Sequence, residues 1–169
     1  MGCGVKTIWL CLLLAVTARA ETNAVAPAVR VAEPAPRFEL SDLAGKTVKL
    51  ADCPSQAVIV CFFLSGDRPS ERVMRPLATL QSEHATNDLA VFGIALDSGP
   101  ASALQAKLTE WAVKFPVLRF NMEVVEGFGG ISAVPTTFVI DQNRNIIQRY
   151  VGFVDVQQLK TDLKVIWRR

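Results

Sequence analysis

Short continuous runs of apolar residues alternate along this chain with stretches in which apolar residues recur every three or four positions. Residues 57–64, AVIVCFFL, are all apolar and include β-branched and aromatic side chains, as expected of a strand that is covered on both faces. From Pro69 to His84, Val73, Leu77 and Leu80 recur at helical spacing. Pro69 suits a first helical turn, because its missing N–H would have no partner within the helix. The pattern therefore predicts a central strand followed directly by a helix.

The same alternation continues to the end of the chain. Leu89–Leu96 predicts a second apolar strand. Asp155 is expected to be the N-cap of a last helix, with Gln158 in the position that completes a capping box. The other elements expected are a helix over Ala101–Val113 with Leu104, Leu108 and Trp111 on one face, a short helix near Glu123–Phe128, an antiparallel hairpin of Thr136–Ile140 and Asn145–Val151 joined by Asp141–Arg144, and inward-facing Leu159, Leu163 and Ile166 in the last helix.

Two short β segments precede the central strand. Arg37–Leu40 and Thr47–Leu50 flank a segment in which Asp42 and Gly45 suit a turn, which predicts a small hairpin. Alternating strands and helices that end in a hairpin and a helix predict an α/β fold. We expect a mixed central sheet flanked by helices on both faces, with the N-terminal β-hairpin as an extension.

Residues 1–20, MGCGVKTIWLCLLLAVTARA, have the pattern of a secretory signal peptide. Lys6 precedes an apolar run from Ile8 to Val16, and Ala18-Arg19-Ala20 forms the A-x-A pattern of a cleavage site. The run is shorter than the ~20 residues that a spanning helix needs, which favours cleavage over an uncleaved anchor. We therefore expect a mature chain that starts at Glu21, is periplasmic or secreted, and has no membrane span.

The remaining composition indicates one globular domain. Residues 21–36, ETNAVAPAVRVAEPAP, lack periodicity and predict an extended linker, which leaves residues 37–169 as the domain. The chain has 18 Lys and Arg against 16 Asp and Glu, and removal of Lys6 and Arg19 would leave 16 against 16. A nucleic-acid partner is not expected, because it would require a clustered basic excess. A single histidine argues against a His-rich metal site, and no cofactor is expected.

Two cysteines, Cys53 and Cys61, would remain in the mature chain. Cys61 lies in the middle of the apolar strand and is interpreted as a small buried residue rather than a reactive thiol. Cys53 lies in a loop and is the candidate reactive thiol, open to a mixed disulfide with a partner. A disulfide between the two would need Cα atoms within ~7 Å, yet the extended path from Ala57 to Cys61 alone spans about 13 Å. An intramolecular disulfide is therefore not expected.

Four segments occur in the order that is typical of one protein family. They are residues 35–40 with Leu43-Ala44-Gly45-Lys46, the strand Val58–Phe63, the segment Val91–Asp97, and the segment Val134–Asp141, VPTTFVID. From about Ala35 onward the chain resembles the thioredoxin-like proteins, in particular the exported thiol-disulfide oxidoreductases related to TlpA and ResA, within the redoxin and AhpC/TSA grouping. The resemblance implies a thioredoxin-like fold in which Pro135 is a cis-proline beside the redox site.

The chain departs from this family where the family carries out its chemistry. There the central strand leads into W-C-x-x-C at the start of the first long helix, and the resemblance assigns Asp67 and Ser70 to the two cysteine positions. The field of a helix N-terminus, which stabilises a thiolate, also stabilises a carboxylate. Asp67 would then be an N-cap worth ~1 kcal/mol, and neither residue can form a disulfide. No catalytic residue is expected here.

What the resemblance leaves intact is a binding site. In the family, the backbone beside the cis-proline pairs with an extended segment of the substrate protein. Arg68 could in addition contact an acidic or carboxylate-bearing partner. The candidate peptide-docking residues are Ser65, Gly66, Asp67, Arg68, Val134 and Pro135.

The function expected is that of an exported, redox-inactive module that binds a protein or peptide, and whether the chain is an enzyme stays open. The alternative is a thiol-disulfide oxidoreductase or antioxidant activity retained through Cys53 with an external thiol. A third interpretation is a structural role in a larger envelope assembly.

Overall fold

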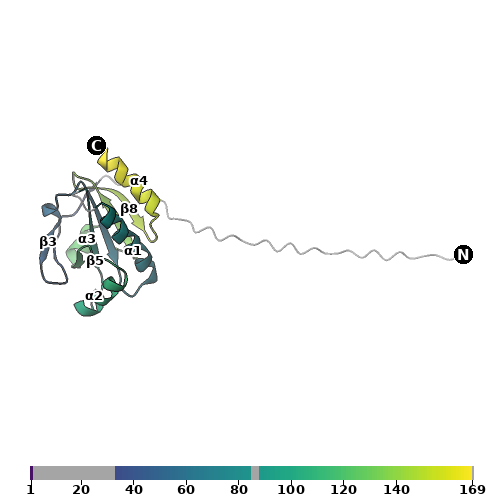
Figure 1. Cartoon of the computed structure of the whole chain (residues 1–169), viewed down its shortest axis with the longest axis horizontal. Helices are drawn as coiled ribbons and strands as arrows, with labels where there is room; N and C mark the ends of the chain where they lie inside the picture. Colours follow the sequence, from purple (N-terminus) through teal and green to yellow (C-terminus); the bar gives the residue numbers. More distant parts are fainter. Residues whose placement is uncertain (2–32, 85–87, 169) are drawn as a thin grey trace.

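The computed structural model describes Met1, residues 33–84 and residues 88–168 (Figure 1). The predicted signal peptide lies outside the described residues apart from Met1, and so do residues 21–32 of the predicted linker. Within the described part of the chain, no helix combines the length and the apolar character needed to cross a membrane.

A mixed sheet forms the centre of the domain, with the strand order β1-β8-β7-β4-β5-β6. Strands β4, β5 and β6 are mutually parallel, whereas β7 runs antiparallel to both β4 and β8. All seven residues of β4 are buried, as predicted for a strand covered on both faces. The strand bounds are β1 Glu33–Pro34, β4 Ala57–Phe63, β5 Leu89–Ala95, β6 Val117–Arg119, β7 Thr136–Ile140 and β8 Asn145–Val151.

The predicted N-terminal hairpin is confirmed as a separate two-stranded antiparallel sheet of β2 (Glu39–Ser41) and β3 (Thr47–Lys49). The Asp42 carboxylate closes its turn by accepting hydrogen bonds from the backbone N–H groups of Ala44 and Lys46, at 2.9 and 2.8 Å. A 3-10 turn follows at residues 50–52. The hairpin lies at the left of the domain in Figure 1, where β3 is labelled.

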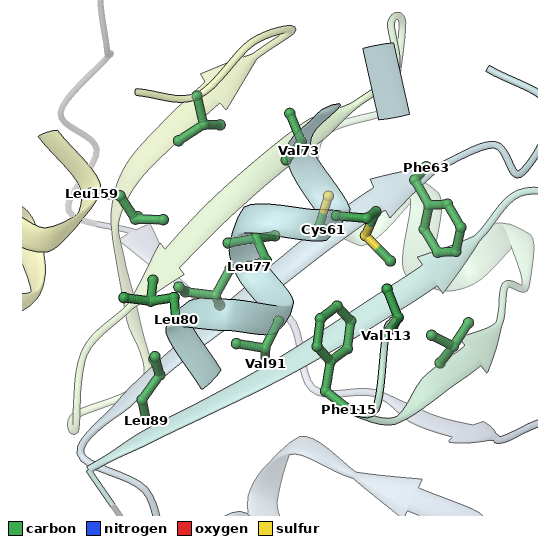
Figure 2. Close-up of a cluster of buried hydrophobic side chains, with 14 of the residues drawn as sticks. Cys61, Phe63, Val73, Leu77, Leu80, Leu89, Val91, Val113, Phe115 and Leu159 are labelled. Carbon is green, nitrogen blue, oxygen red and sulfur yellow. The ribbon is translucent and has the colours of Figure 1, made fainter. Parts of the chain in front are cut away.

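Helices cover both faces of the sheet, as predicted. On one face, side chains of α1, α2 and α4 pack with Cys61 and Phe63 of β4 (Figure 2). On the other face, α3 and the hairpin pack against Val60 and Phe62. Each helix buries apolar side chains: α1 (Arg68–Glu83) buries Val73, Leu77 and Leu80, α2 (Ala101–Glu110) buries Leu104 and Leu108, α3 (Met122–Gly127) buries Val124, and α4 (Val156–Trp167) buries Leu159, Leu163 and Ile166.

The predicted capping box at the start of α4 is wrong. Asp155 is the N-cap and accepts a hydrogen bond from the Gln157 N–H at 2.9 Å, but Gln158 does not reach back to it. The Gln158 side chain instead donates to the Asp162 carboxylate at 3.2 Å, which also accepts from the buried Tyr150 hydroxyl. A buried carboxylate needs hydrogen-bond donors more than an exposed helix end does, and this accounts for the difference.

Two short strands were not predicted. Glu33 and Pro34, inside the predicted linker, pair with β8 as the edge strand β1. Ala35 follows them and donates its N–H to the Arg144 carbonyl at 2.7 Å. The other strand is β6, which pairs only with the last three residues of β5. Among the described residues, no strand therefore pairs with the outer edge of β5 along its first four residues.

Candidate functional site

Helix α1 begins with a side-chain cap at the junction with β4. Asp67 has an extended backbone, φ −105° and ψ 122°, and its carboxylate accepts a hydrogen bond from the Ser70 N–H at 3.1 Å. Pro69 lies in the first turn, where its missing N–H leaves no donor without a partner. The resemblance assigns a thiolate to the position of Asp67, and the carboxylate uses the same helix-start N–H groups.

Ser70 is fully buried, and its hydroxyl group acts both as a hydrogen-bond donor and as an acceptor. The hydroxyl donates to the Asp67 carboxylate at 2.9 Å and accepts from the Leu64 N–H at 3.2 Å. The one histidine of the chain, His84, lies at the opposite end of α1, and its ring is tilted against that of Trp167 with centroids 4.7 Å apart. Ser70 therefore has no imidazole base to activate it as a nucleophile, and its contacts link the end of β4 to the helix cap.

Ser65 connects this junction to the next strand. Its N–H and its hydroxyl both donate to the Asp97 carboxylate, with the hydroxyl contact at 2.7 Å. Arg119, at the end of β6, donates to the carbonyl groups of Asp97 and Gly99 at 3.1 and 2.7 Å. The segments that follow the three parallel strands are therefore tied together at the carboxyl edge of the sheet, where ligands of open α/β sheets usually bind.

Pro135 lies beside the same junction because of the strand register. The peptide bond between Val134 and Pro135 is cis, and the next residue, Thr136, pairs with Phe62 near the end of β4. Since β7 is antiparallel to β4, its start adjoins the segment from Leu64 to Asp67. The Pro135 carbonyl accepts from the Gly152 N–H at 2.7 Å, which fixes this loop to the chain after β8.

Val134 offers a backbone without partners in this part of the fold. Among the described residues, no hydrogen bond reaches its N–H or its C=O, and the residue is partly exposed. Exposed large apolar side chains lie on the adjoining segments: Leu64 follows β4 and is 37% exposed, Val151 ends β8 and is 40% exposed, and Phe153 comes two residues later and is 51% exposed. An unpaired amide group next to an exposed apolar rim can accept one segment of extended peptide.

The arginines at the start of α1 have different surroundings. Arg75 pairs with Glu71 at 2.8 Å on the helix surface, as expected for local pairing. The Arg72 guanidinium lies over the Phe153 ring, 5.6 Å from its centroid. Arg68 is exposed, and no described acidic side chain forms an ion pair with it. Arg68 is thus the cation of this group that is open to a partner's carboxylate.

The two described cysteines are both free and lie apart from the α1 junction. Cys61 is fully buried in the core (Figure 2), and this burial raises the pKa of its thiol to about 12, against a smaller opposite effect of the hydrogen bond from Thr137. The predicted burial of Cys61 is confirmed. Cys53 is partly exposed and follows the 3-10 turn after β3, where its carbonyl accepts from the Arg144 side chain.

The structure thus brings the segment Ser65–Arg68 next to Val134 and Pro135, and it leaves Cys53 elsewhere. The sequence did not single out Asp97, Arg119 or Gly152 as parts of this site. Asp97 ends an apolar strand, which is a signal for the carboxyl edge of a sheet, but its contact with Ser65 spans 32 residues of sequence. In the described residues, no group of three His, Cys, Asp or Glu side chains is placed to hold a metal ion.

Comparison with known proteins gives consistent results. A sequence profile of the AhpC/TSA family matches residues 31–149. Thiol-disulfide oxidoreductase ResA of Geobacillus thermodenitrificans is 28% identical over 165 residues, which cover 95% of this chain and 94% of that protein. ResA of Bacillus anthracis is 27% identical over 139 residues, 82% and 79% of the two chains. A crystal structure of a thiol:disulfide interchange protein of the thioredoxin family from Chlorobium tepidum superposes with a TM-score of 0.72 at 25% identity, covering 80% of this chain and 97% of that one. The expected thioredoxin-like fold is confirmed.

Proposed function

This chain belongs to the AhpC/TSA family as a TlpA/ResA-like redoxin, and we propose that it is an exported member that binds an extended peptide without exchanging electrons with it. The binding site comprises Ser65, Gly66, Asp67 and Arg68 at the α1 junction with Val134 and Pro135 opposite. Export is supported by the A-x-A pattern that follows the apolar run of residues 8–16.

The hydrogen bonding of Asp67 and Ser70 is the observation that carries this proposal. Redox exchange in thioredoxin-like proteins needs a thiolate that attacks a disulfide and a second thiol that resolves the intermediate. At the α1 junction the helix-start N–H and the Leu64 N–H are instead bonded to a carboxylate and a hydroxyl. Cys61 is too deeply buried to replace a surface thiolate.

Peptide binding is supported by the groups that remain open around this junction. The N–H and C=O of Val134 would pair with the main chain of an extended segment, which requires no particular side chain. Leu64, Val151 and Phe153 would contact its apolar residues, and Arg68 would contact a carboxylate. Main-chain pairing at one residue contributes only modestly, so we expect micromolar rather than nanomolar affinity.

The test is a titration with reduced, carboxymethylated insulin B chain, a permanently unfolded probe without free thiols. We expect saturable binding that the Val134→Pro variant weakens, because proline removes the N–H that would pair with the probe. The matched control is Ala133→Pro, which places the same residue one position earlier and keeps the Val134 N–H. Equal affinity of the two variants would contradict the proposed site.

The alternative, an oxidoreductase that works through Cys53 with an external thiol, makes an opposite prediction. In an insulin reduction assay with glutathione, the proposed function predicts the same rate with and without the protein. Turnover above that background that disappears in the Cys53→Ala variant would overturn the redox-inactive assignment.

A further inference from the structure

An open groove of about 1020 Å³ lies away from the α1 junction, along the uncovered outer edge of β5. We call it the β5-edge groove. One wall is the hairpin strand β3 with the loop that carries Cys53, the other is the exposed side of α1 around Thr79, and the connection from α2 to β6 closes one end. It arises because β6 pairs with β5 only at Gly93–Ala95, so no described strand lies on the outer side of the first four residues of β5.

The main-chain groups at this edge are already satisfied by a side chain. The Gln81 amide donates to the Leu89 carbonyl at 3.1 Å and accepts from the Val91 N–H at 2.7 Å. One glutamine thereby takes the place that a neighbouring strand would fill. An extended peptide would have to displace it to add to the sheet, which favours an occupant that binds by apolar contact and charge.

The lining combines partly exposed apolar side chains with an excess of positive charge. Val48, Cys53, Ala78 and Ala90 are all apolar or weakly polar and all partly accessible to solvent. The charged lining residues are four cations and one anion: Lys46, Lys49, Arg75, Lys114 and Asp52.

Two of these cations have no counter-ion within the described chain. Lys49 pairs with Glu39, and Arg75 pairs with Glu71. Lys46 and Lys114 are exposed and form no ion pair with a described residue. Both are therefore available to an anionic group at the end of the groove.

We propose that the β5-edge groove binds an amphipathic small molecule that has a hydrocarbon chain and a single anionic headgroup, with the headgroup between Lys46 and Lys114. A medium-chain carboxylate is the simplest member of this class. The hydrocarbon would lie over Val48, Ala90 and the exposed side of α1. This site is separate from the proposed peptide site, so each stands or fails without the other.

The test uses dodecanoate as the probe and two measurements on the purified full chain: tryptophan fluorescence, because Trp111 lines the groove, and the rate of Cys53 alkylation, followed by peptide mass mapping. We expect saturable binding that slows alkylation of Cys53. The double variant Lys46→Glu, Lys114→Glu should bind about tenfold more weakly or worse, and about 0.5 M salt should weaken binding to the original protein.

Two control variants on α4 match the substitutions in the groove. Lys164→Glu reverses an exposed lysine, and Thr161→Trp matches a groove-filling Thr79→Trp, because each threonine hydroxyl donates to the carbonyl four residues earlier. Figure 1 shows α4 on the opposite side of the domain from β3. We expect Thr79→Trp to abolish binding and both α4 variants to bind as the original does.

Three outcomes would overturn the proposal. The first is the absence of saturable binding below the concentration at which dodecanoate forms micelles. The second is equal binding of uncharged dodecanol, which would show that the lysines do not select an anion. The third is displacement of dodecanoate by an extended acidic peptide with slower exchange of the Val91 amide, which would show that a strand pairs with β5 in place of Gln81.

Discussion

Cys61 and Ser70 are both completely buried, yet the surroundings of each side chain lead to different chemistry. The Ser70 hydroxyl donates to the Asp67 carboxylate and accepts from the Leu64 N–H, so its hydrogen bonding is satisfied although it is buried. Cys61 lies among aliphatic and aromatic side chains, where its sulfur accepts from the Thr137 hydroxyl at 3.5 Å and donates to the Phe62 carbonyl at 3.9 Å. Burial without a nearby positive charge disfavours the thiolate, and the stability of the fold should therefore depend on the ionisation of Cys61.

The first prediction concerns the free energy of unfolding in alkaline solution. The pKa of Cys61 is about 12 in the folded protein against 9.0 for an ordinary thiol, so between these pH values the folded state holds a proton that the unfolded state has lost. Stability must then fall as the pH rises, by up to about 1.4 kcal/mol per pH unit for this one group. Urea unfolding across this range should show a shallower decline for Cys61→Ala.

The slope, rather than the absolute stability, is the quantity to compare, because Cys61→Ala also leaves a small cavity. Burial raises the pKa of Tyr150 as well, and that contribution is common to both proteins. Cys53→Ala is the control, since this thiol lies partly exposed. Equal slopes for Cys61→Ala and the original chain would contradict the prediction.

At the scale of elements, the edge of β5 is completed by the side chain of a helix residue. Open strand edges invite pairing with other chains, and proteins commonly cover or interrupt them. Gln81, near the end of α1, does this for Leu89 and Val91. The same contact holds the C-terminal half of α1 to the sheet, in addition to the apolar contacts of Leu77 and Leu80.

The second prediction is that Gln81→Ala opens this edge. The substitution removes the hydrogen-bond partner of the Leu89 carbonyl and that of the Val91 N–H. This loss should lower the free energy of unfolding by about 1–3 kcal/mol. Hydrogen exchange of the Val91 amide, measured by NMR, should become faster. Gln105→Ala on α2 is the control, because Gln105 is exposed and its substitution leaves β5 unchanged. If the Val91 amide exchanges at the original rate in Gln81→Ala, the edge does not depend on this side chain.

Periodicity predicted the long elements because each leaves a repeated burial pattern in the sequence. The three residues of β6 and the two of β1 are too short to carry a period, and their strand conformation comes from pairing with distant segments. Gln81 reads in sequence as an ordinary polar helix residue. Its role depends on where β5 lies in the folded sheet, which local pattern does not contain.

The candidate site divides in the same way. The N-cap at Asp67 follows from residue types at adjacent positions, and the sequence predicted it. The contact between Ser65 and Asp97 and the one between Pro135 and Gly152 join separate loops. The β5-edge groove likewise forms only when β3, α1 and the segment before β6 come together.

At the scale of the whole molecule, the fold presents two separate surfaces. The α1 junction lies at the carboxyl ends of the parallel strands, next to Pro135. The β5-edge groove runs beside the C-terminal half of α1, toward the hairpin. The scaffold around the junction is that of a thioredoxin-like protein, and this allows a direct test of how residues 67 and 70 correspond to the cysteines of that family.

The third prediction is that the double variant Asp67→Cys, Ser70→Cys forms an intramolecular disulfide under mild oxidation. Oxidised glutathione would accept the two electrons and two protons that the thiols lose, and would leave as two molecules of reduced glutathione. Mass spectrometry under non-reducing conditions should show the loss of two hydrogen atoms. The insulin reduction rate should rise above that of the original chain.

The control is Asp67→Cys, Ser70→Ala, which has one thiol and can form only a mixed disulfide with glutathione. If the double variant also stops at mixed disulfides, residues 67 and 70 are not the positions that correspond to the paired cysteines. The proposed function would then lose its main support.

The contacts among Asp67, Ser70 and Leu64 are hydrogen bonds of a carboxylate, a hydroxyl and a backbone N–H. A pair of cysteines at this place would change between dithiol and disulfide with the reduction potential of the compartment, and the binding of a neighbouring peptide would change with it. A carboxylate and a hydroxyl joined by a hydrogen bond have no second, oxidised form comparable to a disulfide. The affinity of a peptide bound next to Asp67 and Ser70 should therefore be the same under reducing and oxidising conditions.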